Sequence, residues 1–314
     1  MNYYCAPMEG LTDSVYRRLH HAFFGGVDCY YMPFFSPTEH RHLTNREQRE
    51  LPPAESCGFK AVPQVLTKSP EDFLWAAQVC ADLGYEKINL NLGCPSGTVV
   101  AKGKGAGMLA DPAALSGFLE AVFSKTPLPV SIKTRLGLSA PEEFEQLLHV
   151  FNGFPACELI IHPRVRSDYY KGPVRREWFA RAAEESRIPL CCNGGLYTMR
   201  MLREFEESWP QIGSVMIGRG LIGNPGMLSG KTDADTLERF HDALLEEYTA
   251  SFGGPRNAMF RMKEHWRYML CLFDNSGKLG KQLQKTTDLA RYKEISHEIF
   301  CSLPLREELI PDWE

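Results

Sequence analysis

The chain has 314 residues, with 35 Lys and Arg against 39 Asp and Glu, and a formal net charge of −4. Hydrophobic residues make up 44% of the sequence, which excludes global disorder. No apolar run reaches the roughly 18 residues of a membrane span. The length suits a single α/β barrel with an extension, or one large and one small domain.

Ten cysteines are scattered along the chain without CxxC spacing. This pattern argues for a reducing compartment and against zinc or iron–sulfur sites. The first predicted strand follows Met1 almost at once, so no secretory leader is expected. We therefore expect a cytoplasmic protein without a bound metal, not attached to a membrane.

Short β-rich runs alternate with helical stretches up to Gly218. Several of these runs are almost continuously apolar, as expected for parallel strands covered by helices. Eight such strands with intervening helices predict a (β/α)8 TIM barrel. A doubly wound sheet is the competing fold, but no GxGxxG follows the first strand. The predicted strands are 3–6, 29–32, 61–66, 87–92, 129–134, 157–162, 189–193 and 214–218, and helices are predicted at 70–83, 112–125 and 141–151.

After Gly230 the pattern changes, and only helical periodicity is visible beyond a polar linker at 231–235. In 256–273 the apolar residues fall on one helical face, with Arg256, Lys263 and Arg267 on the adjoining face. We predict two domains, a barrel over 1–235 and a small all-helical domain over 236–314. The apolar face consists of Met259, Met262, Trp266, Met269, Leu270 and Phe273.

The charge distribution is more informative than the net charge. Residues 256–293 hold nine Lys and Arg against three Asp and Glu, and residues 163–176 hold five against one. Trp266 and Tyr268 are interleaved with the first group. These local excesses favour a polyanionic partner over a merely solvated helix face.

Residues of chemical interest occur within or just after seven of the eight predicted strands, all except 29–32. The active sites of such barrels lie at the C-terminal strand ends. These residues are therefore candidates for one shared site. They are Met8, Gln64, Asn91, Cys94, Lys133, His162, Asn193 and Arg219.

Cys94 lies between Gly93 and Pro95, just past the fourth predicted strand. An arbitrary cysteine is most often an inert buried thiol, but this position projects a side chain into the barrel mouth. Asn89 and Asn91 interrupt the same buried strand, which is unfavourable unless their amides are hydrogen-bonded. The stretch 96–107 has four glycines and two lysines, which is typical of a mobile loop that closes over a substrate.

Lys133 and His162 end the fifth and sixth strands. A lysine there is usually a solvated strand terminus, whereas an inward lysine needs an anionic partner. His162 alone is weak support for a site, but Arg164 and Arg166 follow it directly. Together they indicate a site for a polyanion.

The loops after strands seven and eight contain Asn193-Gly194-Gly195 and Gly218-Arg219-Gly220. Loops in these positions of a barrel commonly bind a phosphate through backbone N–H groups. Arg219 would add a charged contact. Two ordinary tight turns are the alternative interpretation, which the shared placement at strand ends makes less attractive.

Several stretches resemble the tRNA-dihydrouridine synthase family of FMN-dependent enzymes, in order over about residues 4–270. Two departures from the family pattern are Gly195, where many members have Asp, and Pro163 with Val165 after His162. The matching stretches are Ala6-Pro7-Met8-Glu9-Gly10-Leu11-Thr12-Asp13, Asn91-Leu92-Gly93-Cys94-Pro95, Gly105-Ala106-Gly107-Met108-Leu109, Lys133-Thr134-Arg135-Leu136-Gly137, His162-Pro163-Arg164-Val165-Arg166 with Tyr170, Asn193-Gly194, Val215-Met216-Ile217-Gly218-Arg219-Gly220 and Met262-Lys263-Glu264-His265.

The resemblance implies reduction of uridines in the tRNA D-loop, with Cys94 as the acid and NADPH reducing the flavin. It implies FMN contacts from Pro7, Met8, Glu9, Gln64, Lys133, His162, Asn193, Gly194, Gly195, Gly218 and Arg219. We expect a monomer. We expect substrate contacts from Asn91, Lys102, Lys104, Arg135, Arg164, Arg166, Tyr170, Arg256, Lys263, Arg267, Lys281 and Lys285.

The expected chemistry adds a hydride to C6 of the uracil ring and a proton to C5. A free thiol has a pKa of about 8.5, so it is mostly protonated near neutral pH and can act as the acid. One alternative is an FMN-dependent barrel reductase of a small enone or pyrimidine. Another is an RNA-binding protein with an inactive barrel, against which Cys94, Lys133 and His162 argue.

Overall fold

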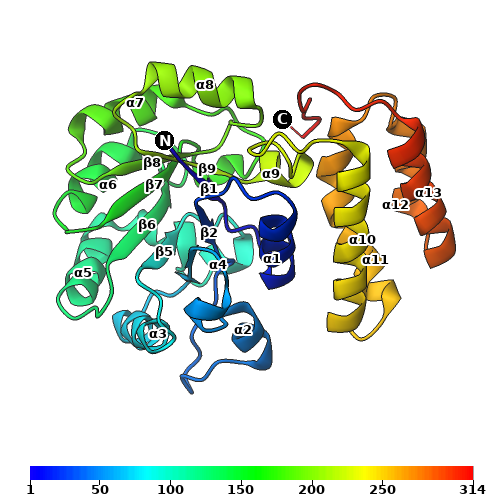
Figure 1. Ribbon diagram of the computed structural model, residues 1–314. Coiled ribbons are helices and arrows are strands. Elements are labelled where there is room, and N and C mark those ends of the chain that lie inside the picture. Colours follow the sequence, from blue (N-terminus) through cyan, green and yellow to red (C-terminus); the bar gives the residue numbers. More distant parts are fainter. Residues whose placement is uncertain (314) are drawn as a thin grey trace.

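The structure is a computed structural model that describes residues 1–313. Within that range a parallel sheet of nine short strands has the order β3-β2-β1-β9-β8-β7-β6-β5-β4 (Figure 1). The end strands β3 (Ala61–Val62) and β4 (Gln64–Val65) are separated in the chain only by Pro63. The sheet therefore closes into a TIM barrel, as predicted from the sequence.

Each predicted strand is present, and only the third is divided. Proline has no backbone N–H, so it interrupts a strand at a position where the sheet needs a backbone donor. The carbonyl oxygen of Pro63 still accepts a hydrogen bond from the N–H of Asn89, at 2.9 Å. The remaining strands are β1 (Asn2–Cys5), β2 (Cys29–Tyr31), β5 (Ile88–Leu92), β6 (Val130–Arg135), β7 (Glu158–His162), β8 (Leu190–Asn193) and β9 (Ser214–Ile217).

Local signals in the sequence explain the starts of the barrel helices. The carboxylate of Asp13 accepts the N–H of Tyr16 at the start of α1, and Ser69 caps α3 just before Pro70. The helices are α1 (Ser14–Phe23), α2 (Asn45–Glu50), α3 (Pro70–Asp82), α4 (Gly97–Val100), α5 (Pro112–Phe123), α6 (Glu143–Phe151), α7 (Arg176–Glu185), α8 (Met199–Ser208) and α9 (Arg219–Gly223).

The barrel interior has three layers. Alternate residues of β7 show them, because Glu158, Ile160 and His162 lie on one face of the strand. Ile160 belongs to a small apolar cluster in the middle, with Tyr31, Cys191 and Met216. Glu158 lies toward the N-terminal strand ends and His162 at the C-terminal ends.

Glu158 closes the N-terminal end of the barrel. Its carboxylate accepts hydrogen bonds from Tyr31 Oη at 2.7 Å, Ser214 Oγ at 3.0 Å and Tyr4 Oη at 3.2 Å. Lys87 Nζ lies 3.4 Å away and supplies the counter-charge. A buried charge is tolerated only with such partners.

We expect Glu158→Ala to lower the free energy of unfolding by about 3 kcal/mol, because it leaves buried hydroxyl groups without an acceptor and Lys87 without its carboxylate. The change is measured by denaturant unfolding. Glu184→Ala removes an exposed carboxylate and should change stability by at most about 0.5 kcal/mol. Equal stability of both variants would mean that the Glu158 network contributes nothing.

The C-terminal part of the chain is helical and lies beside the barrel (Figure 1). It consists of α10 (Ala234–Ser251), α11 (Pro255–Met269), α12 (Gly277–Lys285) and α13 (Leu289–Ser302). The predicted apolar face is confirmed along α11, since Met259, Met262 and Trp266 are fully buried. The helix ends at Met269, so Leu270 and Phe273 of the predicted face lie beyond it. The division into domains after residue 235 stays a prediction. In residues 1–313 no helix is long and apolar enough for a membrane crossing.

These helices contact the barrel at the loop after β1. Tyr248 of α10 donates its hydroxyl to Asp13 Oδ1 at 2.9 Å, and Arg261 of α11 donates to the backbone oxygen of Gly10. Tyr16 of α1 stacks on His265 of α11, with ring centroids 5.4 Å apart. The helices are therefore held beside the segment that carries Met8 and Glu9.

Candidate active site

A cavity of about 460 Å³ lies at the C-terminal ends of the barrel strands. This volume is within the range of small-molecule and cofactor sites. Residues far apart in the sequence meet there, as the strand-end pattern predicted. Of the predicted site residues, it is lined by Pro7, Met8, Glu9, Gln64, Asn91, Cys94, Lys133, Arg135, His162, Arg164, Tyr170, Asn193, Gly194, Gly218 and Arg219.

A chain of side-chain amides forms one wall of the cavity. Asn91 Nδ2 donates to Gln64 Oε1, and Gln64 Nε2 donates to Asn89 Oδ1, both at 2.7 Å. Asn89 Nδ2 continues to Ser131 Oγ at 2.8 Å. The asparagines that interrupt strand β5 are therefore satisfied through Gln64 between them and Ser131, which removes the penalty of burying them.

Asn91 connects this wall to Cys94. Its Oδ1 accepts the backbone N–H groups of Gly93 at 3.0 Å and Cys94 at 2.9 Å. With Nδ2 bonded to Gln64, the amide of Asn91 is largely engaged within the protein. Its main contribution in this structure is to fix the backbone that carries the thiol.

The carbonyl groups around Cys94 are also held. Arg135 Nε donates to Gly93 O at 2.8 Å, and Arg166 Nε donates to Pro95 O at 3.2 Å. The N–H of Ala106, in the following loop, donates to Cys94 O at 3.1 Å. That loop is folded into α4 and a 3-10 turn at Gly105–Ala110, so it packs beside the thiol in this conformation.

The Cys94 side chain is half-buried and reaches the cavity. Desolvation by burial raises the pKa of the thiol, and the nearby Arg135 and Lys133 charges offset only part of this effect. The raised pKa keeps the proton on sulfur at neutral pH. Cys94 is thus suited to donate a proton.

Lys133 projects into the same cavity from β6. Its ammonium makes no ion pair or hydrogen bond within the described residues. Desolvation, and secondarily the charge of Arg135, lowers the pKa of Lys133 to about 8. An unpaired cation in such a place is stabilised by an anionic ligand.

His162 is buried beside Arg164, whose Nη1 lies 3.1 Å from His162 Nε2. Arginine has only donors, so Nε2 is the acceptor and the neutral ring carries its hydrogen on Nδ1. Desolvation and the charges of Arg135 and Lys133 hold the pKa of His162 well below its usual value. The ring therefore remains a neutral donor at physiological pH.

Arg219 follows strand β9 and also lines the larger cavity. Its Nη2 donates to Tyr197 Oη at 2.8 Å, and its Nη1 donates to Tyr170 O at 3.4 Å. No carboxylate within residues 1–313 pairs with this guanidinium. Its positive charge therefore remains available to an anionic ligand.

The two consecutive glycines after β8 are sterically required. Gly194 has φ +109°, and a Cβ there would lie 2.8 Å from His162 Cδ2. Gly195 has φ +70°, and a Cβ there would lie 2.9 Å from Val174 Cγ2. Only glycine fits both the left-handed backbone and the close approach.

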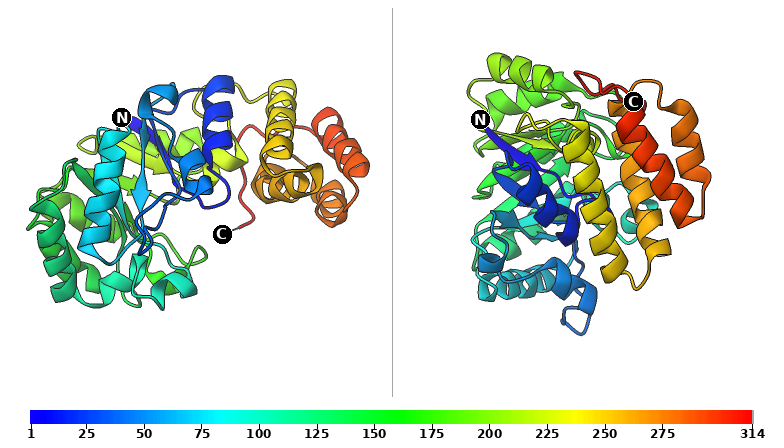
Figure 2. Two further views of the ribbon diagram at one scale, coloured as in Figure 1. Left: turned by 90° about the horizontal axis from the view of Figure 1, so that it is seen from below. Right: turned by 45° about the vertical axis from the view of Figure 1, so that its right-hand side comes forward.

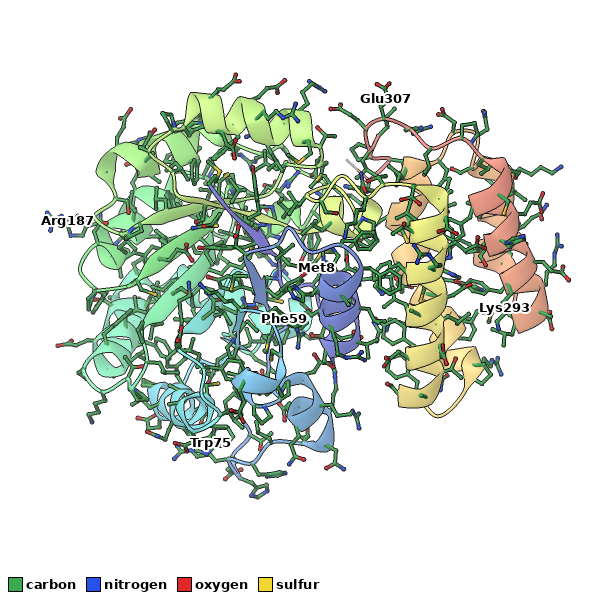
Figure 3. The ribbon with its side chains drawn as sticks, viewed as in Figure 1. Met8, Phe59, Trp75, Arg187, Lys293 and Glu307 are labelled. Atoms are coloured by element: carbon green, nitrogen blue, oxygen red, sulfur yellow. The ribbon has the colours of Figure 1, made fainter. Side chains whose placement is uncertain are left out.

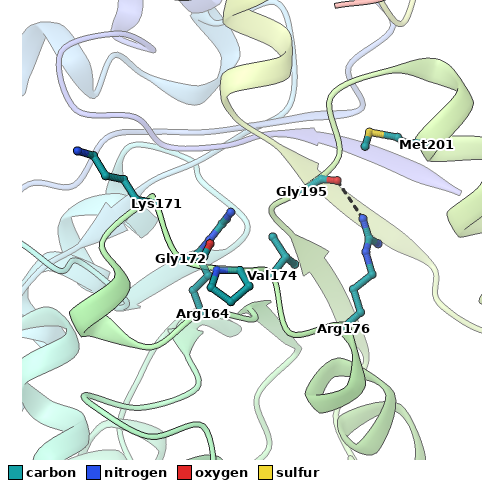
Figure 4. Close-up of a pocket in the computed structure, with 8 residues that line it drawn as sticks. Arg164, Lys171, Gly172, Val174, Arg176, Gly195 and Met201 are labelled. Carbon is teal, nitrogen blue, oxygen red and sulfur yellow. Dashed lines mark hydrogen bonds between the residues drawn. The ribbon is translucent and has the colours of Figure 1, made fainter. Parts of the chain in front are cut away.

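Gly195 lies on a second cavity of about 350 Å³, next to the first (Figure 4). Arg164 and Lys171 border both cavities. Arg176 Nη2 donates to Gly195 O at 2.9 Å, which fixes the loop from outside. Gly194 lines the larger cavity and Gly195 does not, so the predicted flavin contact of Gly195 stays a prediction.

The charge of the larger cavity is strongly positive. Among residues 1–313 its lining contains one carboxylate, Glu9, which is paired with Arg46 on the surface. Its cationic residues are Lys133, Arg135, Arg164, Lys171 and Arg219. This excess selects for an anionic ligand.

Comparison with known proteins identifies the family. The model of the family described as "Dihydrouridine synthase (Dus)" matches residues 4–297. The chain belongs to the dihydrouridine synthase family. A tRNA-dihydrouridine(16) synthase of Aquipseudomonas alcaligenes is 30% identical over 308 residues, covering 92% of this chain and 97% of that protein.

Two further relatives agree with this assignment. A tRNA-dihydrouridine(16) synthase of Pseudomonas putida is 28% identical over 308 residues, covering 92% of this chain and 94% of that protein. The probable tRNA-dihydrouridine synthase 1 of Synechocystis is 27% identical over 320 residues, covering 96% and 86%. As a member of this family of flavin-dependent enzymes, the chain is an oxidoreductase.

In this dihydrouridine synthase, several predicted RNA contacts lie below the surface. Arg135 and Arg164 are 1% and 2% exposed, so they can meet a group inside the cavity but not a phosphodiester outside it. Lys263 is 5% exposed, and its ammonium donates to Gln284 O at 3.2 Å and to Thr286 O. Lys263 is therefore not available to an RNA on the surface.

The two aromatic residues predicted to be interleaved with these cations, Trp266 and Tyr268, are not exposed on the helix surface. Trp266 is fully buried and donates its indole N–H to Tyr292 Oη at 2.9 Å, so it offers no stacking surface. Tyr268 is half-buried and lines the cavity. The predicted cations that remain exposed are Lys102, Arg256, Arg267, Lys281 and Lys285, with Lys104 and Arg166 half-buried.

Sequence patterns missed some of the lining. Phe34, Tyr197 and Trp313 border the cavity. None of them is the last residue of a predicted strand, and none lies in a stretch that resembles the family. Tyr197 follows the loop after β8 by two residues, so it is the one that proximity could have suggested. Trp313 lies some 90 residues beyond the barrel strands, and no local signal marks it.

One group of metal-binding side chain types lies outside this cavity. Glu238, His297 and Cys301 have donor atoms within 4.8 Å of one another on α10 and α13. The trio is partly or fully exposed, and His297 Nδ1 already lies 2.7 Å from Glu238 Oε1. The absence of a bound metal stays a prediction.

Proposed function

We propose that the protein binds FMN in the larger cavity and reduces the C5=C6 bond of a D-loop uridine in tRNA, with Cys94 protonating C5. The observation that carries this proposal is the joint placement of a protonated thiol and the unpaired Lys133 in one positively charged cavity. Two relatives are named for position 16, so position 16 is the first uridine to examine.

The residues present fit an anionic flavin. Arg219 has no carboxylate partner within the described part of the chain, and Gly194, whose lack of a side chain lets the loop after β8 pass close to His162, lines the same cavity. Arg219 with the loops after β8 and β9 would hold the phosphate, and Lys133 would lie beside the ring. FMN, once reduced by NADPH, would supply the hydride for C6.

The protein's own residues would perform the other steps. The target base has to leave its stack to enter the cavity. Asn91, Arg135 and Arg166 fix the backbone on both sides of Cys94, which orients the thiol. The thiol then transfers its proton to C5 and is reprotonated from solvent.

A bound flavin is the direct test of this proposal. We expect purified protein, or apoprotein supplied with FMN, to show flavin absorbance that NADPH bleaches. Arg219→Ala should weaken FMN binding by on the order of 10- to 150-fold, which corresponds to a charged hydrogen bond of about 1.5–3 kcal/mol. Equilibrium titration of the apoprotein with FMN measures this.

Arg203→Ala is the matched control, because it removes an exposed arginine from α8 on the outside of the barrel. Its FMN affinity should equal that of the wild type. Protein that binds no FMN at any concentration would refute the proposed function. Formation of dihydrouridine in unmodified tRNA, followed by mass spectrometry, then distinguishes a tRNA enzyme from a reductase of small enones.

A further inference from the structure

The chain returns to the barrel after its last helix. We call residues 303–313 the return segment; Figure 2 (left) shows its end lying between the barrel and the C-terminal helices. Its start pairs with the stretch after α11, through an antiparallel bridge between Phe273 and Leu305. Asp274 N donates to Pro304 O at 2.9 Å, so the segment leaves α13 in a fixed direction.

Further contacts hold the return segment along its length. Arg306 Nε donates to Asp274 Oδ1 at 2.7 Å, and Leu309 is buried against Gly223 of α9. Near its end, Cys271 Sγ donates to Asp312 Oδ1 at 3.2 Å. These contacts therefore fix the position of the next residue, Trp313.

Trp313 lines the larger cavity beside Arg219. The guanidinium of Arg219 packs on an edge-to-face pair of aromatic rings whose centroids are 6.0 Å apart, and lies 5.4 Å from the centroid of Tyr197 and 5.7 Å from that of Trp313. Arg219 Nη1 also donates to Trp313 O at 3.3 Å. Such stacking fixes the orientation of the guanidinium and adds cation–π attraction.

The indole N–H of Trp313 is buried and has no acceptor in residues 1–313. A buried donor without a partner is unfavourable, and each such group calls for an explanation. Indole nitrogen can only donate. A ligand that offers an acceptor at this wall of the cavity would satisfy it, and Arg219 beside it favours an anionic acceptor.

We propose that Trp313 is part of the flavin phosphate site, where it positions Arg219 and donates its indole N–H to a phosphate oxygen. This inference rests on the proposed function, since it takes FMN as the ligand. It extends the site beyond the barrel, because the return segment carries the residue in from the far end of the helical domain.

The test compares FMN binding to apoprotein carrying Trp313→Phe, Trp313→Ala or the control Trp209→Phe. The phenylalanine variant keeps the ring and loses the N–H, so FMN affinity should fall about tenfold. The alanine variant also loses the stacking on Arg219 and should fall further, about a hundredfold. Trp209 packs on Phe205, outside the cavity, and its variant should bind as the wild type does.

Two readouts separate this role from a structural one. Riboflavin lacks the phosphate, so Trp313→Phe should leave its affinity unchanged. FMN bound nearby should also quench indole emission, and that quenching should shrink in Trp313→Phe but not in Trp209→Phe.

The outcomes are distinct from those for the function itself. Wild-type protein that fails to bind FMN would refute the proposed function. Wild-type binding with unchanged FMN affinity in Trp313→Phe would overturn the role of Trp313 alone. An equal loss of riboflavin and FMN affinity would also overturn it, since the effect would not involve the phosphate.

Discussion

Replacing Cys94 with alanine is expected to slow tRNA reduction by about 10²–10⁴-fold, the usual contribution of a general acid, while NADPH still reduces the flavin at the normal rate. The thiol enters only when C5 of uridine is protonated, so the two half-reactions should separate. Stopped-flow flavin absorbance follows the first half-reaction, and dihydrouridine formation in a single turnover follows the second.

Cys94→Ser sharpens this test, because a hydroxyl keeps the size and polarity of the thiol but is a far weaker acid. It should be nearly as slow as the alanine variant. Burial raises the pKa of Cys94, so the wild-type rate should fall only as pH rises above the ordinary thiol range. Cys301→Ala changes an exposed cysteine on α13 and should leave both half-reactions intact.

Normal dihydrouridine formation in Cys94→Ala would show that another group is the acid. Neighbouring thiols are poor substitutes. Cys191 and Cys192 are fully buried in β8, as their sequence context predicted, and neither lines the cavity. Tyr170 would then be the next residue to examine, because its ring lies over the Arg135 guanidinium beside the thiol loop.

Most of the barrel is predictable because its signals are local. Buried parallel strands appear as apolar runs, and Pro70 or Pro112 marks a first helical turn. Strand register brings the ends together, since Asn91 pairs with Lys133 and Arg135 with His162. Polar residues at separate strand ends can therefore be assigned to one site from their positions in the sequence alone.

The errors concern partners that are distant in sequence. Helical periodicity places Lys263 beside Arg256 and Arg267, but it does not reveal the carbonyl groups at the end of α12 that bind its ammonium. Cations are favourable at such helix C-termini. The sequence likewise does not reveal that Arg135 holds the carbonyls of Gly93 and Val165. Because Arg135 also lines the cavity, its predicted substrate contact stays a prediction, limited to a group inside the cavity.

Removing these buried cations redefines the surface available to tRNA. Arg267 is exposed but lies 3.0 Å from Glu264. Arg256, Lys281 and Lys285 are exposed and have no carboxylate within 4.0 Å in the described chain. We propose that tRNA lies across the barrel mouth and the C-terminal helices, with these cations on one side and Lys102 and Lys171 on the other.

A matched control uses exposed cations of the barrel that line neither cavity. Figure 3 shows Arg187 at the left edge of the barrel, and Lys293 at the right on the C-terminal helices. Lys60, Lys125 and Arg187 are exposed barrel residues. Changing all three to alanine alters the net charge as much as changing Arg256, Lys281 and Lys285, so long-range effects of net charge cancel in the comparison.

The triple variant of Arg256, Lys281 and Lys285 to alanine should weaken tRNA binding by on the order of 10²-fold at about 0.1 M salt. Each phosphate contact releases counterions, so log affinity falls with log salt by about 0.7–0.9 per contact, and loss of three contacts should flatten the slope by roughly 2–2.7. Affinity measured across a salt series gives both quantities.

FMN content and NADPH oxidation with an artificial acceptor should not change, because the cavity is untouched. If the variant and its control have the same affinity and slope, these lysines and arginine form only a solvated helix face, and tRNA binds at another surface.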